Sequence, residues 1–130
     1  MLNSCPLQRL KEIYKEHGHI VVAFDFDETI FPYSGKFKTD KVMDLALRCQ
    51  SSKKCSMILY TCREDEKLEA AIKYCDNNSL FFHAVNKSVT TGFDCRKPFY
   101  NILLDDKAGL PYTYDILTRF LDWIDNGEET

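Results

Sequence analysis

The stretch Ile20 to Phe31 decides the fold of this chain; it reads Ile-Val-Val-Ala-Phe-Asp-Phe-Asp-Glu-Thr-Ile-Phe. Its apolar run, Ile20 to Phe24, gives way abruptly to two carboxylates, Asp25 and Asp27. A continuous apolar run of this length is typical of a strand buried on both faces, as in a parallel sheet. Ligands of open parallel sheets bind outside the carboxyl ends of the strands, where an unpaired carboxylate is costly to bury. The stretch therefore predicts a buried strand with two acidic side chains at that edge.

Length and composition indicate a single domain spanning residues 1–130. A chain of 130 residues can bury a real core but has no room for a second one. The net charge is -3 and no basic run is evident, so a dedicated nucleic-acid surface is not expected. No apolar stretch approaches the roughly 20 residues that span a bilayer, and the first residues lack a signal-peptide pattern. We therefore expect a cytoplasmic protein without a membrane partner.

The six cysteines are scattered and form no metal-binding pattern. They are Cys5, Cys49, Cys55, Cys62, Cys75 and Cys95. No Cys-x-x-Cys pair occurs, and no histidine stands at a spacing typical of zinc sites. We expect reduced thiols, several of them used as small core residues. Cys62 is the cysteine predicted to lie beside the candidate site.

Hydrophobic periodicity divides the chain into alternating helices and strands. Apolar residues at helical spacing predict helices over 6–17, from Thr39 or Asp40 onward, over 64–77 and after Pro111. Short apolar runs predict strands over 20–24, 55–60, 80–85 and 100–104, with a polar loop over 86–96. Strands that alternate with helices form parallel sheets through right-handed crossovers, with helices on both faces. The predicted fold class is therefore α/β, a three-layer sandwich.

Acidic, hydroxyl and basic residues gather where the predicted strands end. In chain order they are Asp25 and Asp27, Thr61, Lys97, and Asp105 with Asp106. This layout resembles the haloacid-dehalogenase superfamily of phosphohydrolases, whose first motif, Asp-x-Asp-x-Thr, is intact from Asp25 to Thr29. The resemblance covers about residues 20–125 and has the four motifs in the family's order. It implies a Rossmann-like core with about four parallel strands in the order 3-2-1-4.

The resemblance implies a role for each carboxylate of the first motif. Asp25 corresponds to the nucleophile, which forms an aspartyl-phosphate and also binds the metal. Asp27 corresponds to the general acid and base, and its backbone carbonyl contributes to the metal site. Dehalogenase members lack a carboxylate at the position of Asp27, so the resemblance favours phosphate chemistry. The implied activity is that of a phosphomonoester hydrolase.

The other motif residues are implied to hold the phosphate and to complete a Mg²⁺ site. Thr61 corresponds to a ligand of a phosphoryl oxygen, and Lys97 to the cation that neutralises the phosphate, although the neighbouring Arg96 is an alternative. At least one of Asp105 and Asp106 completes the metal site. Two unit charges about 4 Å apart repel by on the order of 4 kcal/mol at an effective dielectric near 20. Mg²⁺, a hard cation that prefers oxygen ligands, offsets such repulsion.

Side chains on nearby loops are candidates for substrate binding. Tyr33, Asn86 and Lys87 are predicted at the same edge of the sheet and are candidate substrate contacts. Arg63 either contacts phosphate or substrate, or forms a surface salt bridge with Glu64 or Glu66. The substrate is therefore expected to be a phosphorylated compound held partly by these loops.

Some of the motif residues also have a purely structural interpretation. Aspartates at strand ends often cap turns, and Thr61 could simply close its strand. Thr29 is expected to bond the loop backbone rather than the substrate. A receiver domain also combines an acidic pair, a threonine and a lysine, but in a different order along the chain. A catalytically weak phosphoacceptor or binding protein of the same superfamily remains the alternative function.

Both places where many superfamily members insert a cap domain are short here. The two segments are 31–38 and 86–96. We therefore expect a capless protein whose site is open to solvent. In capless relatives this suggests a bulky or macromolecular phosphoester, or a small substrate enclosed by another subunit, which allows for a homo-oligomer.

Overall fold

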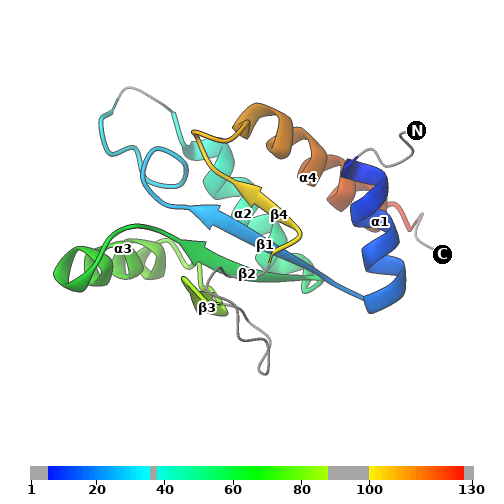
Figure 1. The fold of residues 1–130 in the computed structure, drawn as a ribbon, viewed down its shortest axis with the longest axis horizontal. Coiled ribbons are helices and arrows are strands. Elements are labelled where there is room, and N and C mark those ends of the chain that lie inside the picture. Colours follow the sequence, from blue (N-terminus) through cyan, green and yellow to red (C-terminus); the bar gives the residue numbers. More distant parts are fainter. Residues whose placement is uncertain (1–5, 36–37, 88–99, 128–130) are drawn as a thin grey trace.

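The computed structural model describes residues 6–35, 38–87 and 100–127 and has an α/β fold (Figure 1). A 4-stranded parallel sheet has the order β3-β2-β1-β4. The elements are α1 (Pro6–His17), β1 (Ile20–Asp25), α2 (Asp40–Ser52), β2 (Cys55–Tyr60), α3 (Asp65–Asn77), β3 (Ala84–Val85), β4 (Ile102–Leu104) and α4 (Leu110–Asp125). The predicted fold class and the predicted strand order are both confirmed.

The central strand is β1, which runs between β2 and β4 (Figure 1). It pairs with β2 along its whole length, from Ile20 opposite Cys55 to Asp25 opposite Tyr60. All of its residues before Asp25 are buried. The apolar run is therefore covered on both sides, as the sequence predicted, and Asp25 is its first residue with access to solvent.

Alternate residues of β1 belong to two different apolar clusters. Ile20, Val22 and Phe24 pack in the large core, together with buried side chains of α2 and α4. Val21 and Ala23 pack in a smaller cluster on the other face of the sheet. Because successive side chains of a strand point to opposite faces, burial of both sets fixes the register of β1 and thereby the position of Asp25.

The third strand is shorter than the predicted 80–85, since only Ala84–Val85 pairs with β2. Just before β3, the side chain of His83 takes the place of a backbone acceptor in the hydrogen bonding with β2. The N–H of His83 donates to the Met57 carbonyl at 2.8 Å, and the N–H of Met57 donates back to His83 Nδ1 at 2.9 Å. His83 thus accepts with its ring the bond that a continuing strand would accept with a backbone carbonyl.

The fourth strand is also shorter than predicted and covers Ile102–Leu104 rather than 100–104. Its start has the same arrangement as the third strand. The N–H of Asn101 donates to the Val21 carbonyl at 2.8 Å, and the N–H of Val21 donates to Asn101 Oδ1 at 2.7 Å. Both edge strands therefore begin with a side chain that satisfies a backbone donor of the neighbouring inner strand.

Within the described part of the chain, none of the helices has the length and apolar character needed to cross a membrane. The cysteines described there, Cys49, Cys55, Cys62 and Cys75, are free thiols. Cys62 is exposed and the other three are buried. Cys5 and Cys95 lie outside the described residues.

Candidate active site

The loop that follows β1 is folded around one backbone carbonyl. The carbonyl oxygen of Phe26 accepts hydrogen bonds from the N–H groups of Thr29, Ile30 and Phe31, at 3.3, 2.9 and 2.9 Å. Phe26 and Ile30 are buried and anchor the loop to the core. Glu28 adopts a left-handed conformation with φ 67°, which turns the chain back on itself. Of the two carboxylates of the first motif, Asp25 therefore ends β1 and Asp27 lies on this turn.

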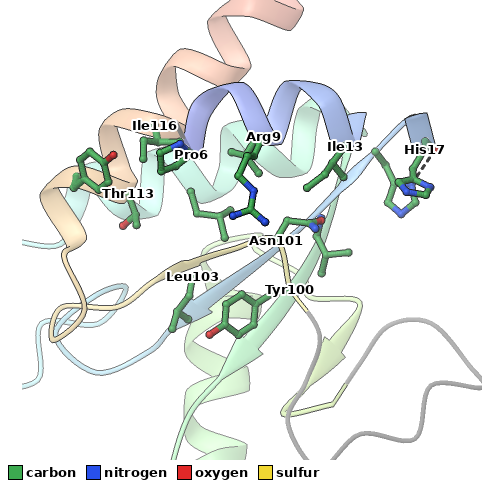
Figure 2. Close-up of a pocket in the computed structure, with 14 residues that line it drawn as sticks. Pro6, Arg9, Ile13, His17, Tyr100, Asn101, Leu103, Thr113 and Ile116 are labelled. Carbon is green, nitrogen blue, oxygen red and sulfur yellow. Dashed lines mark hydrogen bonds between the residues drawn. The ribbon is translucent and has the colours of Figure 1, made fainter. Parts of the chain in front are cut away.

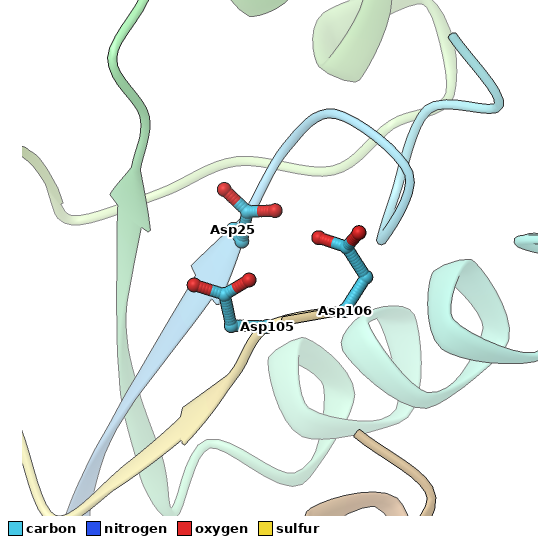
Figure 3. A group of neighbouring side chains, drawn as sticks. All are labelled: Asp25, Asp105 and Asp106. Atoms are coloured by element: carbon cyan, nitrogen blue, oxygen red, sulfur yellow. The ribbon is translucent and has the colours of Figure 1, made fainter. Parts of the chain in front are cut away.

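Three carboxylates meet at the carboxyl edge of the sheet (Figure 3). Asp25 ends β1, and Asp105 and Asp106 follow β4 directly. One oxygen of each lies within 4.8 Å of the others. Carboxylate oxygens are the ligands that Mg²⁺ prefers, usually one or two of them with water completing the octahedron. The donor set therefore fits a hard divalent cation, and it brings together residues of the first and the fourth motifs.

The electrostatics of Asp25 also fit a cation site. Burial, and then the charge of Asp105, raise the pKa of Asp25 to about 7 from its ordinary value of 3.8. Asp106 adds to the shift by a hydrogen bond, whereas a hydrogen bond from Thr29 opposes it. A divalent cation placed among the three oxygens would offset the repulsion from Asp105, which contributes to the shift after burial.

Thr29 is fully buried and connects Asp25 to the acidic pair that follows β4. Its Oγ1 donates to Asp25 Oδ2 at 3.2 Å and accepts from the N–H of Asp106 at 3.0 Å. The sequence predicted that Thr29 bonds the loop backbone, and its backbone partner is that of Asp106. The bond to the Asp25 carboxylate was not predicted.

Asp27 lies apart from the three carboxylates and pairs with Arg63. Arg63 Nη2 donates to Asp27 Oδ1 at 2.7 Å and Nε donates to Oδ2 at 3.0 Å, so the pair is bidentate. The hydrogen bond to Asp27 raises the pKa of Arg63. Neither sequence-based alternative for Arg63 anticipated this partner, because the salt bridge forms with Asp27 rather than with Glu64 or Glu66. The spacing of 36 residues between the two partners gives no local sequence signal.

Thr61 and Asn86 join the ends of β2 and β3. The N–H of Thr61 donates to Asn86 Oδ1 at 2.8 Å, and the N–H of Asn86 donates to the Leu59 carbonyl at 2.8 Å. Thr61 Oγ1 accepts from the N–H of Arg63 at 3.1 Å. Asn86, predicted to contact substrate, thus has its side-chain oxygen engaged in holding Thr61. It also adopts a left-handed conformation, with φ 55°.

These residues line an open cavity of about 940 Å³ at the carboxyl edge of the sheet. Its charged lining comprises Asp25, Asp27, Glu28, Asp105, Asp106, Arg63, Lys67 and Lys107. Tyr33, Thr61 and Asn86 line it as well, so the structure brings the predicted site residues that it describes into one cavity, except for Lys87, which does not line it. Lys97 and Arg96 lie outside the described residues. Lys67 and Lys107 were not predicted, although Lys107 directly follows the acidic pair in the sequence.

A second cavity, of about 760 Å³, lies between α1, β4 and the start of α4 (Figure 2). Arg9 and Ile13 of α1 face Tyr100 and Leu103 across it. It contains none of the residues predicted to act in phosphoryl transfer. The candidate chemistry is therefore confined to the cavity at the carboxyl edge.

Comparison with known proteins gives a similar structure but no name for the activity. No protein-family model matches the sequence, and no curated protein matches it significantly. A solved structure, that of a conserved protein from Bacteroides thetaiotaomicron, is similar with a TM-score of 0.63 and 28% sequence identity. The similarity covers 78% of this chain and 91% of the other chain. It supports the Rossmann-like fold.

Proposed function

We propose that this protein is a Mg²⁺-dependent phosphomonoester hydrolase that acts through an aspartyl-phosphate on Asp25. The observation that carries the proposal is the convergence of Asp25, Asp105 and Asp106 at the carboxyl edge of the sheet, one oxygen of each within 4.8 Å. The resemblance of the four motifs to the haloacid-dehalogenase superfamily supports the same function. Bound Mg²⁺ would supply charge neutralisation for the carboxylates and for the phosphate.

In the proposed first step, a carboxylate oxygen of Asp25 attacks phosphorus, and the bond between phosphorus and the ester oxygen breaks. Asp27 gives a proton to the departing oxygen, which leaves as an alcohol. In the second step, Asp27 takes a proton from water, and the oxygen of that water attacks phosphorus. Asp25 is thereby released as a carboxylate, and inorganic phosphate is formed.

Two further motif residues bind the phosphate in this proposal. Thr61 hydrogen-bonds a phosphoryl oxygen, and Lys97 neutralises the charge of phosphate and nucleophile. Because the cavity is open, its substrate is a phosphorylated molecule that the chain need not enclose, either a macromolecular phosphoester or a small one covered by a second copy. The free thiols of the described residues are compatible with the reducing cytoplasm expected from the sequence.

The function is tested by hydrolysis of p-nitrophenyl phosphate with Mg²⁺ and with EDTA. We expect Mg²⁺-dependent turnover that Asp25→Asn abolishes while the circular dichroism spectrum is unchanged. Asp44→Asn, which removes an exposed carboxylate of α2, is the matched control and should keep full activity. Turnover in Asp25→Asn, at a level beyond contamination, would rule out the covalent mechanism.

One observation favours a second function, that of a phosphoacceptor with slow turnover. Both oxygens of Asp27 accept hydrogen bonds from Arg63, so the proposed acid and base is engaged before any substrate binds. A phosphoacceptor would take a phosphoryl group from acetyl phosphate onto Asp25 and keep it. Intact-mass measurement separates the two functions, since a hydrolase releases phosphate whereas a phosphoacceptor retains one phosphoryl group.

A further inference from the structure

Arg63 is held on several sides by aromatic rings and by the backbone of α3. Its guanidinium carbon lies 4.8 Å from the centre of the Phe26 ring, 5.5 Å from that of Phe31 and 6.0 Å from that of Tyr33. Its Nη1 donates to the Lys67 carbonyl in the first turns of α3 at 3.2 Å. The side chain is only 16% exposed. Such a guanidinium, stacked on rings and anchored to a helix, has little freedom to leave its place.

The immobilised guanidinium of Arg63 donates hydrogen bonds to both carboxylate oxygens of Asp27. Asp27 stands only two residues after Asp25, yet it is not in the group of three carboxylates that can share one ion. A flexible carboxylate so near a Mg²⁺ site would be drawn in as a further ligand. It would then fill a coordination position that the octahedral ion otherwise leaves to water or to a phosphate oxygen.

We propose that Arg63 is a positioning residue that holds the Asp27 carboxylate outside the metal-binding group and so keeps it available for proton transfer; this rests on the proposed function. In this arrangement Arg63 acts on Asp27 and leaves the phosphate to other groups. This role requires an arginine, because its planar guanidinium can donate to both carboxylate oxygens at once. A lysine keeps the positive charge, but its ammonium group does not form the bidentate contact with the carboxylate.

The kinetic test uses Arg63→Lys and Arg63→Ala with p-nitrophenyl phosphate. We expect kcat to fall by about 100-fold in Arg63→Ala, the lower end of what a general acid or base contributes, with KM changed less than twofold. In Arg63→Lys kcat should stay at least tenfold below that of the wild type. Added methylguanidinium should restore part of the activity of Arg63→Ala, while urea at the same concentration should not. Wild-type kcat in Arg63→Lys would overturn the proposal, because charge alone would then suffice.

The matched control is Arg48→Ala. Arg48 also binds two carboxylates, Asp122 and Asp125, at 2.8 and 2.7 Å, and its side chain is part-buried, but it lies on the α2 and α4 side away from the cavity. Its loss should lower the thermal midpoint without changing kcat. A drop in kcat in Arg48→Ala equal to that in Arg63→Ala would show a general effect of stability, and would overturn the positioning role.

A second measurement does not depend on turnover. If Arg63 keeps Asp27 from the ion, Mg²⁺ measured by calorimetry should bind several-fold more tightly to Arg63→Lys than to the wild type. The gain should vanish in the double variant Arg63→Lys with Asp27→Asn. Unchanged Mg²⁺ affinity in Arg63→Lys would overturn the proposal. If the wild type binds Mg²⁺ but hydrolyses no phosphoester, the proposed function fails, and this measurement alone decides the role of Arg63.

Discussion

The hydroxyl of Thr29 accepts a hydrogen bond from the backbone N–H of Asp106 at 3.0 Å, so that the loop after β1 is tied to the end of β4. The same hydroxyl donates to Asp25 at 3.2 Å. One buried oxygen therefore sets the distance between the proposed nucleophile and the acidic pair. The threonine of the Asp-x-Asp-x-Thr pattern thus has a structural role within the group of three carboxylates.

Thr29→Val should destabilise the protein and weaken its binding of Mg²⁺. Valine has nearly the shape of threonine, but it leaves the Asp106 N–H and the Asp25 carboxylate without their partner. Loss of a buried partner costs about 1–3 kcal/mol of the free energy of unfolding. Urea denaturation measures this loss, and Thr29→Ser, which keeps the hydroxyl, should retain the Mg²⁺ affinity of the wild type. Equal Mg²⁺ affinity in the valine and serine variants would contradict the role of the hydroxyl.

Stabilisation by Mg²⁺ should increase as the pH rises through 7. The pKa of Asp25 is raised to about 7 in the folded protein and is 3.8 ordinarily, so the folded state binds more protons between these values. The metal-free protein therefore loses stability as the pH rises from about 4 to about 7. Mg²⁺ binds the ionised carboxylates, so it competes with this proton at low pH and binds freely above pH 7.

Thermal melts with Mg²⁺ and with EDTA, at pH 5.5 and pH 8, measure this effect. At a Mg²⁺ concentration 100 times its Kd the gain is about 2.7 kcal/mol. Asp25→Asn should remove most of the dependence on pH, and Asp105→Ala or Asp106→Ala should reduce the gain at pH 8. Asp44→Asn again serves as the control. A midpoint indifferent to Mg²⁺ at pH 8 would argue against the metal site.

The sequence predicted the strands whose burial is continuous and misjudged those at the edges. Residues Ile20–Asp25 and Cys55–Tyr60 are inner strands, and their apolar runs are long because both faces are covered. At the edges, His83 and Asn101 replace backbone acceptors with their side chains and delay the start of β3 and β4. An apolar pattern cannot reveal such a replacement, since it depends on how one side chain turns toward a neighbouring strand.

The same limit applies to the site. The carboxyl ends of parallel strands meet at one edge of the sheet, so the convergence of Asp25 with Asp105 could be predicted from their places at the ends of strands. The pairing of Asp27 with Arg63 could not, because it depends on the loop that turns at Glu28 and on the rings stacked beneath the guanidinium. Sequence proximity pointed instead to Glu64.

Asn86→Ala should lower kcat by releasing Thr61, rather than by removing a substrate contact. It removes the acceptor of the Thr61 N–H and places alanine at φ 55°, a left-handed conformation that asparagine and glycine adopt more readily. We expect a loss of about 1–3 kcal/mol of stability. Asn86→Asp keeps an acceptor at the same place and should preserve most of the activity. If Asn86→Ala changes only the choice of substrate, the residue contacts substrate after all.

Tyr33 should govern the choice of leaving group. Its ring is 71% exposed at the cavity and has one face near the Arg63 guanidinium, so the rest of the ring is available to a bound molecule. A small aryl phosphate needs little of this surface, whereas a bulky phosphoester reaches past the carboxylates to the rim. Tyr33→Ala should therefore lower kcat/KM several-fold for phosphorylated oligonucleotides or nucleotides, because an exposed aromatic contact contributes only about 1 kcal/mol. For p-nitrophenyl phosphate, which needs little of this surface, kcat/KM should change less than about twofold. Tyr112→Ala removes a similarly exposed ring, 60% exposed, beside the other cavity and should change neither. Loss of aryl phosphate hydrolysis in Tyr33→Ala would instead place the ring among the groups that hold Arg63 for catalysis.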